Sequence, residues 1–177
     1  MLVGVPKEIK NHEYRVGLTP AGVMEFVKNG HSVVIEHNAG IGVGFSNDLY
    51  EKAGAIILRT AEEIFSKADM IIKVKEPQPN ECKMLHEGQI LFTYLHLAPD
   101  PLQTKGLIDS GCVAIAYETV TDTTGRLPLL APMSEVAGRM SIQAGMHSLE
   151  KAQGGSGVLL AGVPGCLLYT SPSPRDS

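Results

Sequence analysis

The chain has 177 residues, of which 44% are hydrophobic and 19% charged, and its formal net charge is −4 at pH 7. This composition is typical of a globular protein with one domain or one and a fraction, and the acidic balance with scattered Lys and Arg excludes a nucleic-acid partner. The sequence has no basic leader before an apolar run and no stretch of about 18 apolar residues, so it predicts a cytoplasmic protein that does not enter the membrane.

Residues 2–119 alternate between short apolar strands and helices. We expect strands within residues 2–8, 31–37, 55–59, 70–76, 89–96 and 112–119, and helices over residues 19–30, 46–54, 60–69, 79–88 and 100–111. Thr19 is the expected N-cap of the first helix, with Pro20 at its first position, and Thr60 and Glu63 have capping-box spacing. Parallel strands need crossover connections, so the alternation predicts an α/β fold with a mostly parallel sheet and flanking helices.

The sequence changes character after residue 120. A polar turn and a proline-containing apolar piece at 121–132 predict a domain boundary, which gives a first domain over 1–130. Residues 133–155 carry an apolar helical stripe and predict a long helix ending at Gly154 and Gly155, within a connecting segment over 131–165. Residues 166–177 are Ser/Pro-rich without periodicity, and we expect a non-native or disordered tail there.

Four polar residues lie near the expected carboxyl ends of strands, where parallel α/β sheets bind their ligands. They are expected on one rim of the sheet: Arg15, Lys75, His96 and Glu118.

Each of these residues also has a structural interpretation. Arg15 is either a solvated side chain or a bidentate clamp for a carboxylate. Lys75 shares the parity of Lys73 in an apolar strand, and a lysine there needs an anionic or carbonyl partner, whether structural or a ligand. His96 is either a hydrogen-bonded structural histidine or an acid/base, and Glu118 could simply pair with a cation.

The remaining reactive residues show no recognisable pattern. The other histidines lack metal-ligand spacing, and the three cysteines are odd in number and far apart, so we expect neither a metal site nor a disulfide framework. The glycine-rich segments 39–44 and 154–165 do not match the strand–turn–helix context of a dinucleotide fingerprint.

Four segments, in order, resemble the amino-terminal part of the bacterial alanine dehydrogenases over residues 1 to about 165: MLVGVPKEIKNHEYRVGLTP, KVKEPQPNE, LFTYLHLAPD and LPLLAPMSEVAGRMSIQAG. The resemblance implies a Rossmann-like or flavodoxin-like substrate domain and an NAD-dependent enzyme that interconverts L-alanine with pyruvate and ammonia. It further implies that Arg15 and Lys75 bind substrate, that His96 is the catalytic acid/base, and that Ser134 contacts the cofactor.

The same resemblance implies a homohexamer and the start of an NAD-binding domain after the long helix. No glycine fingerprint or ribose-binding acid follows Gly165, so we expect this domain to be truncated here and the fragment alone to be inactive. Two alternatives stay open. One is the NAD-binding alpha subunit of proton-translocating transhydrogenase, and the other is a non-enzymatic α/β ligand-binding or signalling module.

Overall fold

The computed structural model describes residues 1–160 of the chain. Contacts divide it into two units, the first over Met1–Leu127 and the second beginning at Pro128. The functional division into residues 1–130 and 131–165 stays a prediction, and the tail expected at residues 166–177 lies outside the described residues.

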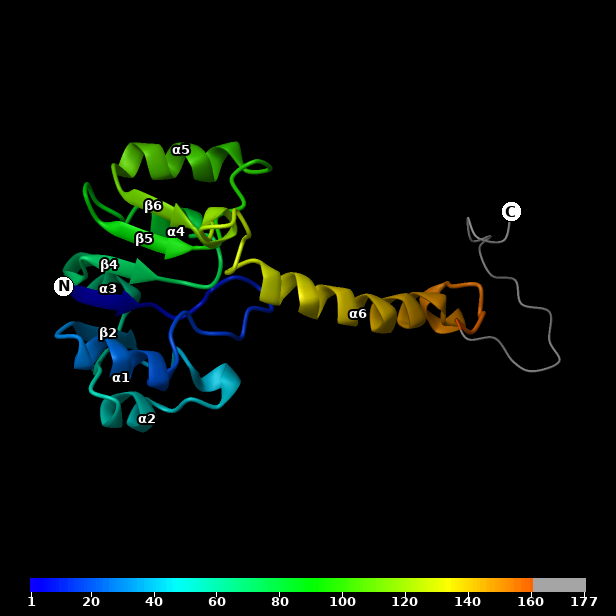
Figure 1. The fold of residues 1–177 in the computed structure, drawn as a ribbon, viewed down its shortest axis with the longest axis horizontal. Helices are drawn as coiled ribbons and strands as arrows, with labels where there is room; N and C mark the ends of the chain where they lie inside the picture. Colours follow the sequence, from blue (N-terminus) through cyan, green and yellow to red (C-terminus); the bar gives the residue numbers. More distant parts are fainter. Residues whose placement is uncertain (161–177) are drawn as a thin grey trace. The chain divides into compact units, whose positions relative to one another are not determined.

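The first unit is built on a parallel sheet, as the alternating pattern predicts. Within the described residues the sheet has six strands in the order β3-β2-β1-β4-β5-β6, and every paired neighbour is parallel (Figure 1). The strands are β1 Leu2–Val5, β2 Ser32–Glu36, β3 Ile56–Leu58, β4 Met70–Ile72, β5 Ile90–Thr93 and β6 Val113–Ala116. The order reverses between β1 and β4, which defines a doubly wound α/β fold.

Helices pack on both faces of this sheet. They are α1 Pro20–Lys28, α2 Asn47–Lys52, α3 Ala61–Lys67, α4 Pro79–Cys82 and α5 Pro101–Ser110. One buried cluster contains residues of α1 and α2 together with Val33 and Ile35 of β2. A second buried cluster contains residues of α3 and α5 together with Val34, the strand residue between Val33 and Ile35. Successive strand residues point to opposite faces, so both faces of the central strands are buried and their sequences are continuously apolar.

Local sequence signals set where these helices begin. The Thr19 hydroxyl accepts the Gly22 backbone N–H at 3.2 Å at the start of α1. Thr60 and Glu63 form the expected reciprocal capping box at α3, with the Glu63 N–H donating to the Thr60 hydroxyl at 3.3 Å. The prediction of both caps is confirmed.

The strands are shorter than the sequence predicts at the end nearest the polar residues, and β1, expected to reach residue 8, ends at Val5. Strand β4 ends at Ile72, β5 at Thr93 and β6 at Ala116. Lys75, His96 and Glu118 therefore follow the strands rather than ending them. Beyond β4 the Lys73 N–H still donates to the Phe92 carbonyl at 3.1 Å, so a sheet-like hydrogen bond continues past the end of the strand.

The second unit, as far as it is described, contains one long helix and a short turn. Helix α6 spans Ala131–Leu149 and is followed by the 3-10 helix η3, Lys151–Gln153. The helix begins two residues before the predicted start because Pro132 is tolerated in the first turn, where its missing N–H has no helical partner. Within residues 1–160, no helix is both long and apolar enough to cross a membrane.

The packing of α3 on β1 gives a stability prediction at Gly4. A Cβ at Gly4 would lie 2.7 Å from the Ala68 Cβ and 2.7 Å from the Ile64 Cγ2, which is too close for either atom. We expect Gly4→Ala to lower the free energy of unfolding by about 1–3 kcal/mol, as overpacking does in other cores. Urea denaturation followed by tyrosine fluorescence measures this change.

Gly138→Ala is the control, because nothing lies within 4 Å of a Cβ at that position of α6. A Gly4→Ala protein as stable as the parent would show that α3 can move away from β1 at little cost.

Candidate functional site

The reversal of strand order between β1 and β4 places two chain segments at the crevice where doubly wound sheets bind ligands. The segment after β1 contains Arg15, and the segment after β4 contains Lys75. The segments after β5 and β6 contain His96 and Glu118. All four residues thus follow the carboxyl ends of their strands, and their roles stay predictions.

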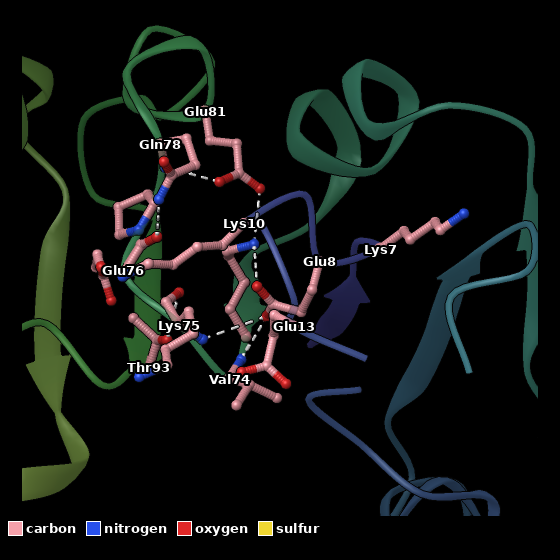
Figure 2. A network of polar contacts seen from close by, with 12 residues as sticks. Lys7, Glu8, Lys10, Glu13, Val74, Lys75, Glu76, Gln78, Glu81 and Thr93 are labelled. Carbon is pink, nitrogen blue, oxygen red and sulfur yellow. Dashed lines mark hydrogen bonds and ion pairs between the residues drawn. The ribbon is translucent and has the colours of Figure 1, made fainter. Parts of the chain in front are cut away.

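A buried ionic triad connects the first two segments. The Lys73 Nζ lies 2.7 Å from Glu81 Oε1 and 3.1 Å from Glu8 Oε2, and the three side chains are at most 2% exposed. Figure 2 shows Glu8 and Glu81 within the surrounding polar network. Lys73 therefore has the anionic partners that a lysine in an apolar run requires.

The remaining oxygens of the triad bind backbone amides. Glu8 Oε1 accepts the Val74 N–H at 2.6 Å and the Lys75 N–H at 3.4 Å, while Glu81 Oε2 accepts the Gln78 N–H at 2.8 Å at the start of α4 (Figure 2). The triad therefore fastens the segment after β1, the segment after β4 and the N-terminus of α4 to one another.

The triad holds two carboxyl groups and one ammonium. Burial raises the pKa of the Glu8 carboxyl, although the Lys73 charge and the Val74 N–H both act to lower it. The positive charge of Lys73 therefore offsets part of the free-energy cost of burying the two carboxyl groups.

Glu13 pairs with Arg15, one of the two cations predicted to bind substrate. Its carboxylate accepts the Arg15 Nε–H at 2.8 Å and an Nη2–H at 2.5 Å, and it also accepts the Arg15 backbone N–H at 3.0 Å. The hydrogen bond from Arg15 is the main reason that the pKa of the Glu13 carboxyl is lowered, and the Lys75 charge contributes in the same direction. Glu13 is thus bound directly by Arg15 and feels the positive charge of Lys75.

His96 is held between an aromatic ring and a carboxylate. Its ring stacks on Tyr94, with centroids 6.1 Å apart and planes inclined by 13°, and Tyr94 packs edge-on against Tyr117 at 5.0 Å. Glu118 Oε1 accepts the His96 backbone N–H at 2.8 Å. Burial raises the pKa of Tyr94, and the charge of Arg15 opposes this rise.

Ser134 belongs to the second unit. It lies on the first turn of α6, is exposed there, and its hydroxyl donates to the Leu130 carbonyl at 3.4 Å. Its proposed cofactor contact stays a prediction.

Sequence reasoning missed four residues of the network, which are Glu8, Glu13, Lys73 as an ion-pair centre, and Glu81. One signal was present, because an interior lysine demands a carboxylate. Of the two partners of Lys73, Glu81 lies 8 residues away in sequence, whereas Glu8 lies 65 residues away. Glu118 also differs from expectation, since the hydrogen bonds that the structure gives its carboxylate come from backbone amides rather than from a cation.

The fold and the polar rim define a doubly wound α/β domain with cationic and imidazole side chains at its switch-point edge. Residues 4–137 match the family described as alanine dehydrogenase/PNT, N-terminal domain. The chain belongs to this family.

Individual relatives agree with this assignment. The chain is 59% identical over 165 residues to alanine dehydrogenase from Halomonas elongata, a match covering 93% of this chain and 44% of that protein. A solved L-alanine dehydrogenase superposes with a TM-score of 0.82 at 53% identity, covering 93% of this chain and 45% of the other. A transhydrogenase from Sinorhizobium meliloti is less similar, with a TM-score of 0.66 and 27% identity over 70% of this chain and 35% of the other. The chain therefore spans less than half the length of these proteins.

The triad predicts unequal effects of two neighbouring lysine substitutions. Lys73→Met leaves two buried carboxyl groups without their cation, and we expect it to lower the free energy of unfolding by about 3–5 kcal/mol at pH 7. The half-buried Lys75 is the matched control, and Lys75→Met should change stability by less than about 1 kcal/mol. Urea denaturation measures both.

The Lys73→Met defect should also depend on pH. Burial already raises the pKa of the Glu8 carboxyl, and loss of the Lys73 charge removes an influence that lowers it, so the folded state of the variant binds a proton at Glu8 more tightly. Stability is then regained as the pH falls and is lost as it rises through the folded pKa. Equal losses for the two variants, or a pH-independent loss for Lys73→Met, would contradict this account of the triad.

Proposed function

We propose that the chain is the substrate-binding part of an NAD-dependent L-alanine dehydrogenase, which oxidatively deaminates L-alanine to pyruvate and ammonia in a reversible reaction. The observation that carries the proposal is the presence of a guanidinium, an ammonium and an imidazole after β1, β4 and β5 of a fold that matches an L-alanine dehydrogenase so closely. The 59% identity to a curated alanine dehydrogenase supports the same choice.

Each rim residue has a chemical task in this proposal. Arg15 binds the substrate carboxylate, for which a guanidinium has well-placed paired donors. Lys75 donates to the oxygen or nitrogen on the reacting carbon and stabilises the charge that develops there. His96 gives a proton to that substituent, or takes one from it, as a general acid/base. NAD, when bound, accepts or supplies the hydride at the same carbon.

The described residues fit one part of a dinucleotide site. Ser134 offers an exposed hydroxyl for a cofactor contact. The glycine-rich segment after β2 does not offer a phosphate cradle, because a Cβ at Gly40 would meet the Tyr50 hydroxyl at 2.7 Å and one at Gly42 would meet the Tyr14 carbonyl at 2.7 Å. These glycines allow the chain to pack on itself, so we assign no pyrophosphate contact to them.

The alternatives have less support. The solved transhydrogenase is less similar to this chain than the solved L-alanine dehydrogenase is, and its lower identity favours the dehydrogenase. No feature of the described residues favours a non-enzymatic module over an enzyme. The homohexameric assembly, the cytoplasmic location and the use of NAD are expectations that come with the proposed activity.

A chimaeric enzyme tests the proposal directly. Residues 1–165 of this chain would be joined to the remaining part of the Halomonas elongata enzyme, whose matching segment is 59% identical. We expect ammonia- and pyruvate-dependent oxidation of NADH, with a turnover number in the ordinary enzyme range of about 1–1000 per second. A chimaera that folds, ignores pyruvate and instead passes hydride to a second nicotinamide nucleotide would favour the transhydrogenase.

His96 provides a sharper test in the same chimaera. Asn tolerates the left-handed backbone that His96 adopts but transfers no proton, so His96→Asn separates chemistry from folding. We expect kcat to fall by about 100- to 10,000-fold while the melting temperature changes little. The exposed His86 is the control, and His86→Asn should keep the parent kcat. A fully active His96→Asn enzyme would show that His96 is structural and not the acid/base.

A further inference from the structure

His96 has an unusual backbone conformation for a residue with a side chain. Its φ is +50°, and among residues 1–160 only His12 and Asn38 are other non-glycine residues with positive φ. Left-handed backbone is unfavourable for L-residues and persists where the surrounding structure enforces it. Something beyond the local sequence must therefore hold His96 in place.

Glu118 makes the contacts that can do this. Its Oε1 accepts the N–H of His96 at 2.8 Å and that of Leu95 at 3.0 Å, and its Oε2 lies 3.3 Å from the same Leu95 nitrogen. Glu118 sits in the 3-10 helix η2, Tyr117–Thr119, directly after β6. In the pairing of β5 with β6, Thr93 lies opposite Ala116, so both segments leave the sheet at the same level and the carboxylate bridges them.

The electrostatics favour a charged acceptor at this position. Burial acts to raise the pKa of the Glu118 carboxyl, but the backbone N–H groups of His96 and Leu95 outweigh it and the pKa is lowered. The group is therefore ionised at neutral pH. Hydrogen bonds from amides to an ionised carboxylate are roughly twice as strong as those to a neutral acceptor.

We propose that Glu118 is a positioning residue for His96: its carboxylate holds the His96 backbone in the left-handed conformation and thereby fixes the direction of the imidazole beside Tyr94. The proposal rests on the proposed function only in taking His96 as the acid/base. Its structural half concerns the backbone of His96 and is measured without any reaction.

Asp122 also accepts backbone N–H groups with its carboxylate, but these hydrogen bonds stabilise only its own turn. Its carboxylate accepts the N–H of Thr124 at 2.8 Å and that of Arg126 at 3.0 Å within its own loop. Like Glu118, it follows β6 and binds backbone amides, but it touches no residue assigned to the reaction. Asp122 is therefore a matched control for Glu118.

The structural half is tested by NMR on the 177-residue chain. We expect the amide protons of Leu95 and His96 to titrate together, with a midpoint below the ordinary glutamate value, and this titration to vanish in Glu118→Gln. In Glu118→Ala, the couplings and Cα shift that report φ should show His96 leaving the left-handed region. Amides that do not respond to pH, or an unchanged φ at His96 in Glu118→Ala, would overturn the proposal.

The functional half is tested in the chimaeric enzyme. Glu118→Ala should lower kcat by about 10- to 100-fold, as displacement of a catalytic group does, while KM for NADH changes less than twofold. Glu118→Gln retains one acceptor oxygen and should recover part of the loss, whereas Asp122→Ala should keep the parent kcat. Circular dichroism checks that each variant is folded, and an unfolded Glu118→Ala leaves Glu118→Gln as the deciding variant.

The outcomes separate the two proposals. A parent chimaera without pyruvate activity contradicts the proposed function and leaves the NMR result to decide whether Glu118 holds His96. An active parent with fully active, folded Glu118→Ala and Glu118→Gln variants contradicts the positioning role alone. Equal losses in the Glu118 and Asp122 variants would assign the effect to the whole loop.

Discussion

The burial of one lysine between two glutamates determines how the edge of this sheet is arranged. Lys73 lies directly after β4, at the point where the strand order reverses, and its ammonium contacts Glu8 and Glu81 from two other segments. A buried charge without a partner would be very costly. These segments therefore cannot separate without leaving an ion either exposed to solvent or buried and unpaired. The geometry of the rim therefore depends on the ion pairs of Lys73, which do not require a bound ligand.

Backbone amides are the second recurring element of this edge. Glu8 binds the N–H groups of Val74 and Lys75, and Glu118 binds those of Leu95 and His96. In each case the carboxylate comes from the segment after a neighbouring strand and holds the main chain of a residue expected to act on the substrate. Loops fixed through their own main chain can present flexible side chains, such as that of a lysine, from a defined starting point.

The fold could be predicted from the sequence because its signals are local. Apolar runs, Thr caps and the Thr60–Glu63 capping box each lie within a few residues, and together they indicate alternating strands and helices. The strand ends could not be predicted in the same way. The run from residue 70 to 76 is apolar enough to read as one strand, but β4 ends at Ile72, where Lys73 turns to a carboxylate 65 residues away in sequence.

The place of the candidate site in the fold could be predicted from the sequence, but the contacts that hold its residues could not. The rule that ligands bind at the carboxyl ends of parallel strands predicts that Arg15, Lys75, His96 and Glu118 share one rim, whereas their roles come from the family resemblance and stay predictions. It says nothing of the left-handed φ at His96, which depends on a carboxylate 22 residues further along the chain. Periodicity reports which face of an element is apolar, whereas a long-range bond to a main-chain amide leaves no periodic trace.

The pairing of these glutamates bears on the proposed binding of an anionic substrate at this rim. Glu8, Glu81 and Glu118 each accept at least one backbone N–H, so part of their charge is compensated by peptide dipoles. Glu8 and Glu81 are also buried against Lys73. Their negative charge is therefore balanced in part within the protein, and the carboxylate of Glu13 accepts two hydrogen bonds from the Arg15 guanidinium. In the proposed function, a substrate carboxylate would approach Arg15 and Lys75, whose positive charges attract an anion.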